Sequence, residues 1–299
     1  MHAASGWAPL RAKAFRRLWT AQFVSNVGSW MQTVAAQWVM LSLTTSAVLV
    51  SGISAVGSLP VLLLAIPAGV WGDLFDRRRL IVGTQVVMLA AATALAILAA
   101  FSALTPALIL ALLFVIGCGT AASSPTWQTL QPELVPASDR TQAIALGSVN
   151  QNLARAVGPA LGGLLLAATS AAVVFGVNAA SFVVVVLVVV LTAVPARRST
   201  LPREHVAEAV RAGGRYVRNS PLLLALIARA AAFIFPAGAI WALLPLVAHD
   251  RLELGSVGYG LLLACVGGSV PWSRRLSAPS CGGGWLRGRS TPSPRRPSP

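Results

Sequence analysis

Eight apolar stretches, separated by short polar or charged gaps, follow one another along the chain. A helix needs about 20 apolar residues to cross a bilayer, and the last stretch only just reaches this length. The valine-rich residues 183–190 would favour a strand in water, but in lipid a helix satisfies its own backbone hydrogen bonds. We therefore expect an all-α polytopic membrane protein. Its transmembrane helices are expected at residues 18–43, 47–71, 80–101, 107–127, 142–167, 172–194, 221–248 and 255–272.

The gaps divide these helices into two groups. The longest polar connection, residues 195–220, contains six arginines and two glutamates, and we interpret it as a cytoplasmic linker between two bundles. The end of the chain is rich in Arg, Pro, Ser and Gly, a composition typical of disorder. The expected segments are a cytoplasmic N-terminus at 1–17, a six-helix transmembrane bundle at 18–194, the linker at 195–220, a partial C-terminal bundle of two helices at 221–272 and a disordered basic tail at 273–299.

Composition supports a membrane location and orients the chain. Of 299 residues, 56% are hydrophobic and 10% are charged, whereas about 25% of a soluble domain is charged. A net charge of +15 would suggest nucleic-acid binding in a soluble protein, but here the basic residues lie in gaps between apolar runs. With the N-terminus inside, fourteen basic residues before the tail lie inside and only Arg251 lies outside.

This asymmetry predicts a multi-pass protein of the inner (plasma) membrane with a cytoplasmic N-terminus. We expect the lipid bilayer as its surroundings and no nucleic-acid partner. Twenty-two arginines against the single Lys13 are typical of a GC-rich genome, and we expect a bacterial source.

Residues for catalysis or metal binding are not grouped in this sequence. Cys118, Cys265 and Cys281 are far apart and none lies near a histidine, so neither a metal cluster nor a disulfide framework is indicated. The apolar runs contain no acid pair, and the chain has no phosphate-binding loop. We therefore expect no metal, no cofactor, no catalytic residues and no enzymatic activity. All eight carboxylates lie in loops or at helix ends, so no intramembrane carboxylate is available to carry a proton.

Polar residues of the first expected helix recur at spacings of three and four, which places them on one helical face. They are Gln22, Asn26, Ser29, Thr33 and Gln37, flanked by Ser25 and Gln32. Such a face should avoid lipid. Two roles fit it: Gln22, Asn26, Ser29 and Thr33 line a cavity for a polar substrate, or they join neighbouring helices by hydrogen bonds.

Arg155 and Arg229 are the charged residues that lie well inside apolar runs. A mid-membrane arginine costs about 2.5 to 3.5 kcal/mol on insertion scales, so each needs a partner or a water-filled cavity. Both are candidates for binding an anionic substrate. Arg229 lies about two turns from the cytoplasmic end of its helix, so its side chain can instead snorkel to the membrane surface.

The loop between the second and third expected helices carries a charged cluster, GVWGDLFDRRRL, at residues 69–80. It resembles the Gly-x-x-x-Asp-Arg-x-Gly-Arg-Arg signature of the major facilitator superfamily, although Leu74 and Asp76 replace the usual Arg and Gly. The matching residues are Gly69, Asp73, Arg77 and Arg78. The resemblance implies a gating loop, in which the aspartate latches onto a helix of the second half and the glycine lets helices approach.

Two longer stretches resemble the branch of this superfamily called transmembrane secretion effectors, which includes the enterobactin exporter. They are LVPASDRTQAIALGSVNQNLARAVGPALGGLLLAA and IWALLPLVAHDRLELGSVGYGLLLA, and the resemblance extends from Phe15 to Val266. It implies the major facilitator fold, with two six-helix halves. This chain would hold the complete first half and helices 7 and 8 of the second.

The fifth expected helix contains the sequence Gly158, Pro159, Gly162 and Gly163. It resembles the end of the antiporter signature of drug exporters in this superfamily, although Ala145 and Ala154 replace two expected glycines. The alternative is that these residues only bend the helix and let a neighbour approach.

The resemblance implies export of a small molecule, such as a siderophore or a drug, by alternating access, with protons as the candidate coupling ion. From Ser269 onward the chain no longer resembles the family and looks like sequence translated out of frame. We therefore expect a truncated or frameshifted product without helices 9 to 12. The alternative function is a non-transporting fragment of such an exporter.

Overall fold

A computed structural model describes residues 6–192, Arg215 and residues 218–268. Every regular element in these ranges is helical and none is a strand, as predicted. The first six long helices are α1 (Lys13–Leu43), α2 (Ala47–Leu74), α3 (Arg77–Ala100), α4 (Pro106–Glu133), α5 (Arg140–Ala168) and α6 (Ala171–Leu191). The helices α8 (Pro221–Leu246) and α9 (Ser256–Gly268) follow them in the chain. Three short helical turns complete the described elements: η1 (Ala8–Arg11) before α1, η2 (Ala137–Asp139) between α4 and α5, and η3 (Val247–Arg251) between α8 and α9.

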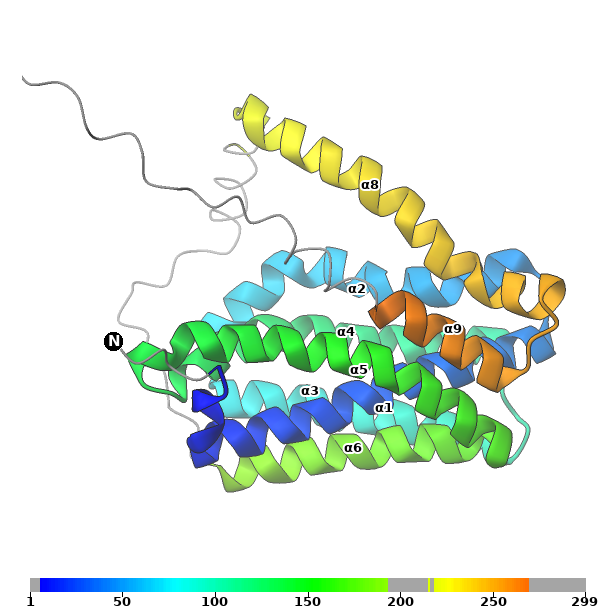
Figure 1. Cartoon of the computed structure of the whole chain (residues 1–299), viewed down its shortest axis with the longest axis horizontal. Helices are drawn as coiled ribbons and strands as arrows, with labels where there is room; N and C mark the ends of the chain where they lie inside the picture. The colour runs from blue at the N-terminus through cyan, green and yellow to red at the C-terminus, as the bar shows by residue number, and fades with distance from the viewer. Residues whose placement is uncertain (1–5, 193–214, 216–217, 269–299) are drawn as a thin grey trace, which may run out of the picture.

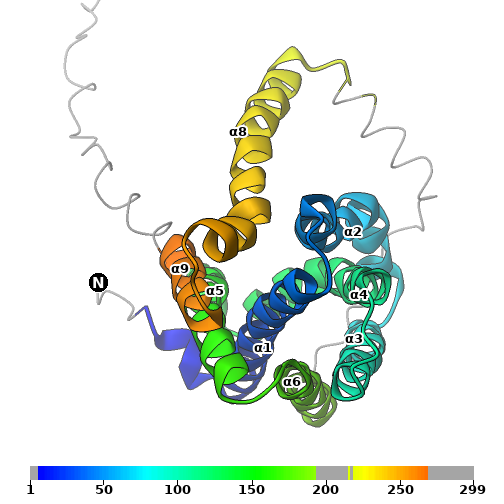
Figure 2. The same cartoon turned by 90° about the vertical axis from the view of Figure 1, so that its right-hand side faces the viewer.

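The helices α1 to α6 run back and forth along one long axis and form a bundle (Figure 1). Viewed along this axis, α1 lies near the middle, and the other five helices surround it (Figure 2). The largest apolar cluster contains Met40, Leu95, Ile109, Phe175 and Phe182, all fully buried. One apolar core is therefore shared by α1, α3, α4 and α6.

Helix ends follow local chemistry as well as hydropathy. The first helix begins at Lys13, earlier than the predicted residue 18, because Phe15 is already buried while Arg16 and Arg17 are exposed. Asp76 caps α3 by accepting a hydrogen bond from the Arg79 backbone N–H at 2.9 Å. Residue 76, where the family signature has glycine, therefore starts a helix in this chain.

The fourth helix is longer than predicted. Its expected end at residue 127 was placed where the apolar run stops, but α4 continues to Glu133. The extra residues remain helical because Leu130 and Gln131 are buried against the bundle, so the polar positions do not form a surface loop. A polar segment of a membrane helix can thus be mistaken for a connection.

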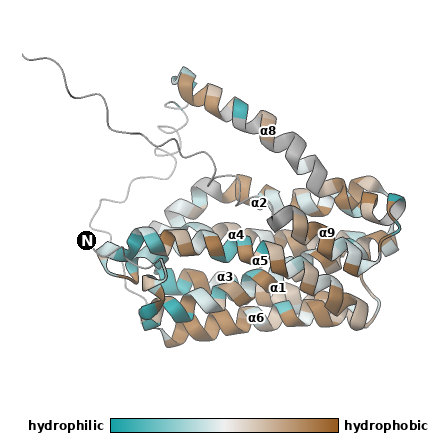
Figure 3. Cartoon of the chain, viewed as in Figure 1, coloured by the Kyte–Doolittle hydropathy of each residue, from teal (hydrophilic) through white to brown (hydrophobic). Residues whose placement is uncertain are grey.

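Four of the described helices, α2, α3, α4 and α6, are long and apolar enough to cross a membrane. Figure 3 shows that α6 is almost uniformly hydrophobic, whereas polar residues gather toward the end of the bundle that holds the N-terminus. Helix α9 covers 13 residues, and residues 269–272 of the expected span at 255–272 lie outside the described residues. Most of the predicted linker at 195–220 and the whole predicted tail at 273–299 also lie outside them.

The last two helices attach to the bundle at the end opposite the N-terminus. The C-terminal end of α8 reaches the bundle near α2, whereas its N-terminal half diverges from it (Figures 1 and 2). After η3, α9 runs back along α5. Tyr259 of α9 is fully buried and donates a hydrogen bond to Gln37 Oε1 of α1 at 2.5 Å.

Candidate transport cavity

A polar cavity of about 710 Å³ lies inside the bundle. Its walls come from the N-terminal halves of α1, α3 and α5 and the C-terminal half of α4, so it occupies the half of the bundle nearest the N-terminus. The polar lining residues are Gln22, Ser25, Asn26, Ser29, Gln85, Thr120, Ser123, Ser124, Gln128, Gln131, Ser148, Gln151, Asn152 and Arg155.

Three residues of the polar face predicted for the first helix line this cavity: Gln22, Asn26 and Ser29. Two of them also join helices, since Asn26 Nδ2 donates to Asn150 Oδ1 at 2.8 Å and Gln131 Nε2 donates to Gln22 Oε1. Cavity lining and hydrogen bonding between helices therefore occur together on this face, while its contact with a substrate stays a prediction. Thr33 is not among the lining residues, and its hydroxyl donates to the Ser29 carbonyl at 2.9 Å.

Arg155 supplies the charge of the cavity. Arg155 is the single charged residue among the described lining residues, and these residues include no Asp or Glu. Its guanidinium carbon lies 5.7 Å from the centroid of the Trp30 ring, within range of a cation–π interaction. The buried Nε of Arg155 has no hydrogen-bond partner in the structure. The cavity thus contains a cation that an aromatic face partly stabilises and that no described lining carboxylate neutralises.

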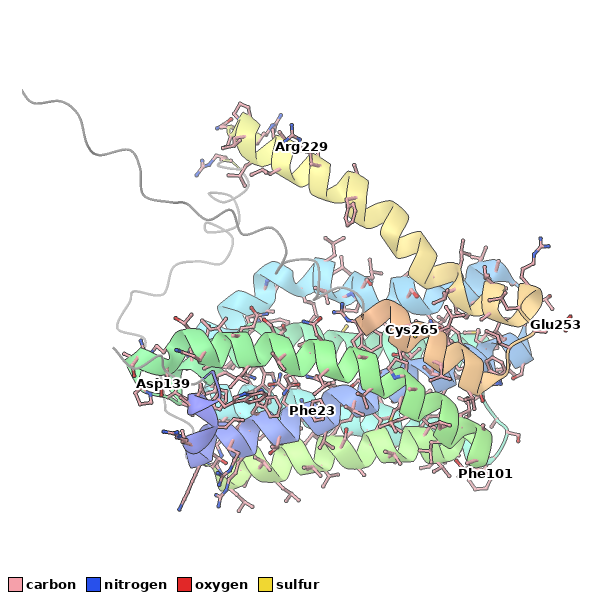
Figure 4. All side chains as sticks on the ribbon, in the orientation of Figure 1. Phe23, Phe101, Asp139, Arg229, Glu253 and Cys265 are labelled. Atoms are coloured by element: carbon pink, nitrogen blue, oxygen red, sulfur yellow. The ribbon has the colours of Figure 1, made fainter. Side chains whose placement is uncertain are left out.

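Arg229 is not brought to the cavity. It lies on the diverging half of α8 and is exposed (Figure 4). Both roles considered for Arg229, binding an anionic substrate and snorkelling to the membrane surface, stay predictions.

The prediction from sequence missed most of the α4 and α5 wall. The missed residues on α4, Thr120, Ser123, Ser124, Gln128 and Gln131, are spaced by one helical turn or by one residue. On α5, Gln151 and Asn152 lie one turn before Arg155, and Ser148 lies two turns before it. The same three-and-four spacing that identified the α1 face was therefore present in both helices.

The glycines of the antiporter-like signature are packing positions against two helices. A Cβ atom at Gly158 would lie 2.5 Å from Trp30 Cβ, and one at Gly162 would lie 2.7 Å from Met31 Cα, both on α1. On the other side, a Cβ at Gly163 would lie 2.4 Å from the Ser256 carbonyl oxygen of α9. Likewise, a Cβ atom at Gly260 of α9 would lie 2.4 Å from the Pro159 carbonyl oxygen of α5. Close approach, one of the two roles considered for this sequence, occurs here.

The charged loop between α2 and α3 fixes the neighbouring helix ends. Arg77, 3% exposed, pairs with both carboxylate oxygens of Glu133 at the end of α4, at 2.6 and 3.2 Å. Arg78 donates to the carbonyl of Val190 near the end of α6. A Cβ atom at Gly69 would meet nothing within 4 Å, so in this structure Gly69 is not a close-approach position. The side chain of Asp73 lies outside the described part.

The sequence profile of the family described as transmembrane secretion effector matches residues 4–273. This match covers most of the 299 residues. The chain belongs to this family of the major facilitator superfamily. As a transmembrane secretion effector, it is a membrane protein of a transporter family rather than of an enzyme family.

This transmembrane secretion effector is similar to several bacterial transporters. It is 26% identical to macrolide efflux protein A of Streptococcus pyogenes over 239 residues, which cover 79% of this chain and 59% of the relative. It is 29% identical to the enterobactin exporter EntS of Shigella boydii over 263 residues, which cover 85% of this chain and 60% of that protein. The chain thus spans about 60% of the length of these relatives.

Solved structures support the fold assignment. A bacterial homologue of the human lysosomal transporter Spinster, solved in an inward-facing and unoccupied conformation, superposes with a TM-score of 0.69 at 16% identity. The superposition covers 87% of this chain and 60% of that one. The peptide transporter POT, solved in complex with sulfate, superposes with a TM-score of 0.52 at 19% identity, and the superposition covers 81% of this chain and 50% of that one.

Proposed function

We propose that this protein exports a small molecule across the bacterial inner membrane by alternating access. The observation that carries the proposal is the polar cavity of about 710 Å³ inside a bundle of apolar helices. Lipid cannot satisfy buried polar groups, so such a cavity is typical of a pathway for water and polar solutes. Its volume lies in the range of roughly 300–1,000 Å³ that holds drug-sized ligands.

Export is favoured over uptake by the names of similar proteins. They include a macrolide efflux protein, an enterobactin exporter and a multidrug efflux pump. The exported compound would enter from the cytoplasm if the N-terminal end of the bundle is cytoplasmic, as the distribution of basic residues predicts. The cavity occupies that same half of the bundle.

Alternating access requires that the two halves of the bundle open in turn. The half away from the cavity is packed by α9 against α1 and α5, through Tyr259–Gln37 and the glycine contacts at Gly163 and Gly260. We propose that these contacts separate when the protein opens outward. In that state the cavity residues would face the outside.

Proton exchange is part of the proposal and needs a titratable group. The described cavity lining holds no carboxylate, and the acidic residue next to it in sequence, Glu133, is paired with Arg77. An imposed pH gradient tests the coupling directly: acidification outside should accelerate efflux from cells, and efflux that ignores the gradient would contradict proton antiport.

Efflux from cells that express the full chain tests the function. Cells loaded with a fluorescent efflux substrate should lose it faster than cells with an empty vector, and Arg155→Gln should slow this loss while the exposed-site control Arg229→Gln does not. If expressed, membrane-inserted protein gives no efflux above the empty vector, the alternative of a non-transporting fragment is favoured.

A further inference from the structure

We propose that the cavity selects hydroxylated organic anions with one acidic group and discriminates against organic cations. This inference rests on the proposed function because it assigns the chemistry of the transported molecule. Three features of the lining lead to it: the sign of its charge, its unpartnered polar atoms and its aromatic rings.

The charge of the lining is the first step. Arg155 is the charged side chain among the described lining residues, and no described lining carboxylate opposes it. Cation–π contact with Trp30 at 5.7 Å stabilises the guanidinium but does not neutralise it. An anion bound in the cavity removes this imbalance, whereas an organic cation adds to it.

The unpartnered atoms are the second step. Arg155 Nε and Gln85 Oε1 are both buried, both belong to lining residues and both lack a hydrogen-bond partner in the structure. Gln85 is only 5% exposed. Buried polar groups are normally paired, so each of these atoms identifies a place for a complementary ligand atom or water.

One atom is a donor and the other is an acceptor. The Nε–H of Arg155 needs an acceptor, which an acidic group of the ligand supplies with charge assistance. The Oε1 of Gln85 needs a donor, which a carboxylate lacks and a hydroxyl group provides. A hydroxylated acid satisfies both atoms, since its acidic group accepts from Nε–H and its hydroxyl donates to Oε1.

The position of the two atoms sets the arrangement of these groups. Gln85 lies on α3 and Arg155 on α5, and Figure 2 shows these helices on opposite sides of α1. A ligand that carries its acidic group and its hydroxyl groups at opposite ends suits this placement on two helices. Trp30 and Trp127 are also among the lining residues, and aromatic side chains pair favourably with a flat ligand ring.

Four small aromatic probes distinguish these requirements by isothermal titration calorimetry with the full chain in lipid nanodiscs. They are 3,4-dihydroxybenzoate, benzoate without the hydroxyls, 3,4-dihydroxybenzamide without the charge, and dopamine as the matched catechol cation. The first should bind most tightly. We expect benzoate to bind about 5- to 10-fold more weakly for the lost hydroxyl contact, and the amide and the cation at least about 10-fold more weakly for the lost charged contact.

Variants assign these preferences to the two residues. Arg155→Gln should remove the preference for the acid over the amide, whereas Arg155→Lys, which retains the charge, should keep it. Gln85→Leu should remove the preference for the hydroxylated acid over benzoate. The matched control Arg229→Gln removes an exposed arginine outside the cavity and should leave all four affinities unchanged.

Several outcomes would overturn the inference. Dopamine bound as tightly as the acid, benzoate bound as tightly as its hydroxylated analogue, or no binding of any probe would each do so. The result also separates this inference from the proposed function. Selective binding without efflux would contradict the export proposal alone, while efflux of an organic cation through this cavity would contradict the inference alone.

Discussion

The close contact between α5 and α9 depends on the absence of a side chain at Gly163, and we predict that alanine at this position destabilises the protein. In Gly163→Ala, the new Cβ would lie 2.4 Å from the Ser256 carbonyl oxygen, 3.1 Å from its carbonyl carbon and 3.3 Å from Gly260 Cα. Ordinary van der Waals contact begins near 3.4 Å, so the two helices must move apart by about 1 Å. Both nearest atoms belong to the backbone of α9, which cannot rotate away as a flexible side chain can.

Two opposing terms determine the size of the effect. Overpacking of this kind lowers the free energy of unfolding by about 1–3 kcal/mol. Replacing glycine by alanine within a helix raises the free energy of unfolding by about 0.5–1 kcal/mol. Gly176→Ala on α6 provides a matched control, because its Cβ would meet nothing within 4 Å and it keeps only the helix term. The difference between the two variants isolates the overpacking term, about 1–3 kcal/mol against Gly163→Ala.

Reversible unfolding of both variants in mixed micelles measures this difference. Gly163→Ala should be less stable than Gly176→Ala by that amount, and Gly260→Ala, whose Cβ would lie 2.4 Å from the Pro159 carbonyl oxygen, should behave like Gly163→Ala. Equal stability of Gly163→Ala and Gly176→Ala would refute the close packing of α5 on α9.

Two further predictions concern buried polar pairs. Glu133→Ala removes the partner of the Arg77 guanidinium, which is only 3% exposed, and should destabilise the protein by about 3 kcal/mol. This value is the lower end of the range for a broken buried pair, because Glu133 itself is 37% exposed. A loss of stability under about 1 kcal/mol in the same unfolding assay would show that the pair behaves as an ordinary surface ion pair. Tyr259→Phe leaves Gln37 Oε1 buried without its donor and should cost about 1–3 kcal/mol, while the double variant with Gln37→Leu should recover most of this loss. No recovery in the double variant would show that the hydroxyl does not act through Gln37.

The sequence predicted the all-α fold because membrane helices must satisfy their own backbone and therefore appear as long apolar runs. It located helix ends less well. Helix α4 extends past residue 127 because Leu130 and Gln131 pack inside the bundle, which hydropathy alone cannot distinguish from a polar loop. Likewise α1 begins before residue 18, since Phe15 is buried although basic residues surround it.

The candidate site was predicted in part. Helical periodicity was sufficient to place Gln22, Asn26 and Ser29 on one face, and Arg155 stood out as a charge within an apolar run. Periodicity could not show where the cavity stops, so Thr33 was included although it lies beyond the lining. Arg229 looked equivalent to Arg155 in sequence, and only the divergence of α8 from the bundle separates the two.

Contacts between distant helices were beyond the reach of the sequence. The prediction that glycine and proline in the fifth helix permit close approach did not specify the partners, which are α1 for Gly158 and Gly162 and α9 for Gly163. The signature glycine Gly69 illustrates the opposite limit, since a matching residue type does not guarantee a neighbour in this structure.

The central claim is that this chain moves a small molecule through the cavity that contains Arg155. The most direct measurement is transport of radiolabelled 3,4-dihydroxybenzoate by the full chain reconstituted in liposomes, compared with Arg155→Gln and with the exposed-site control Arg229→Gln. We predict transport above that of empty liposomes for the unaltered chain and for Arg229→Gln, and a loss of at least about 10-fold for Arg155→Gln. Transport equal to that of empty liposomes, or equal in all three proteins, would contradict the account.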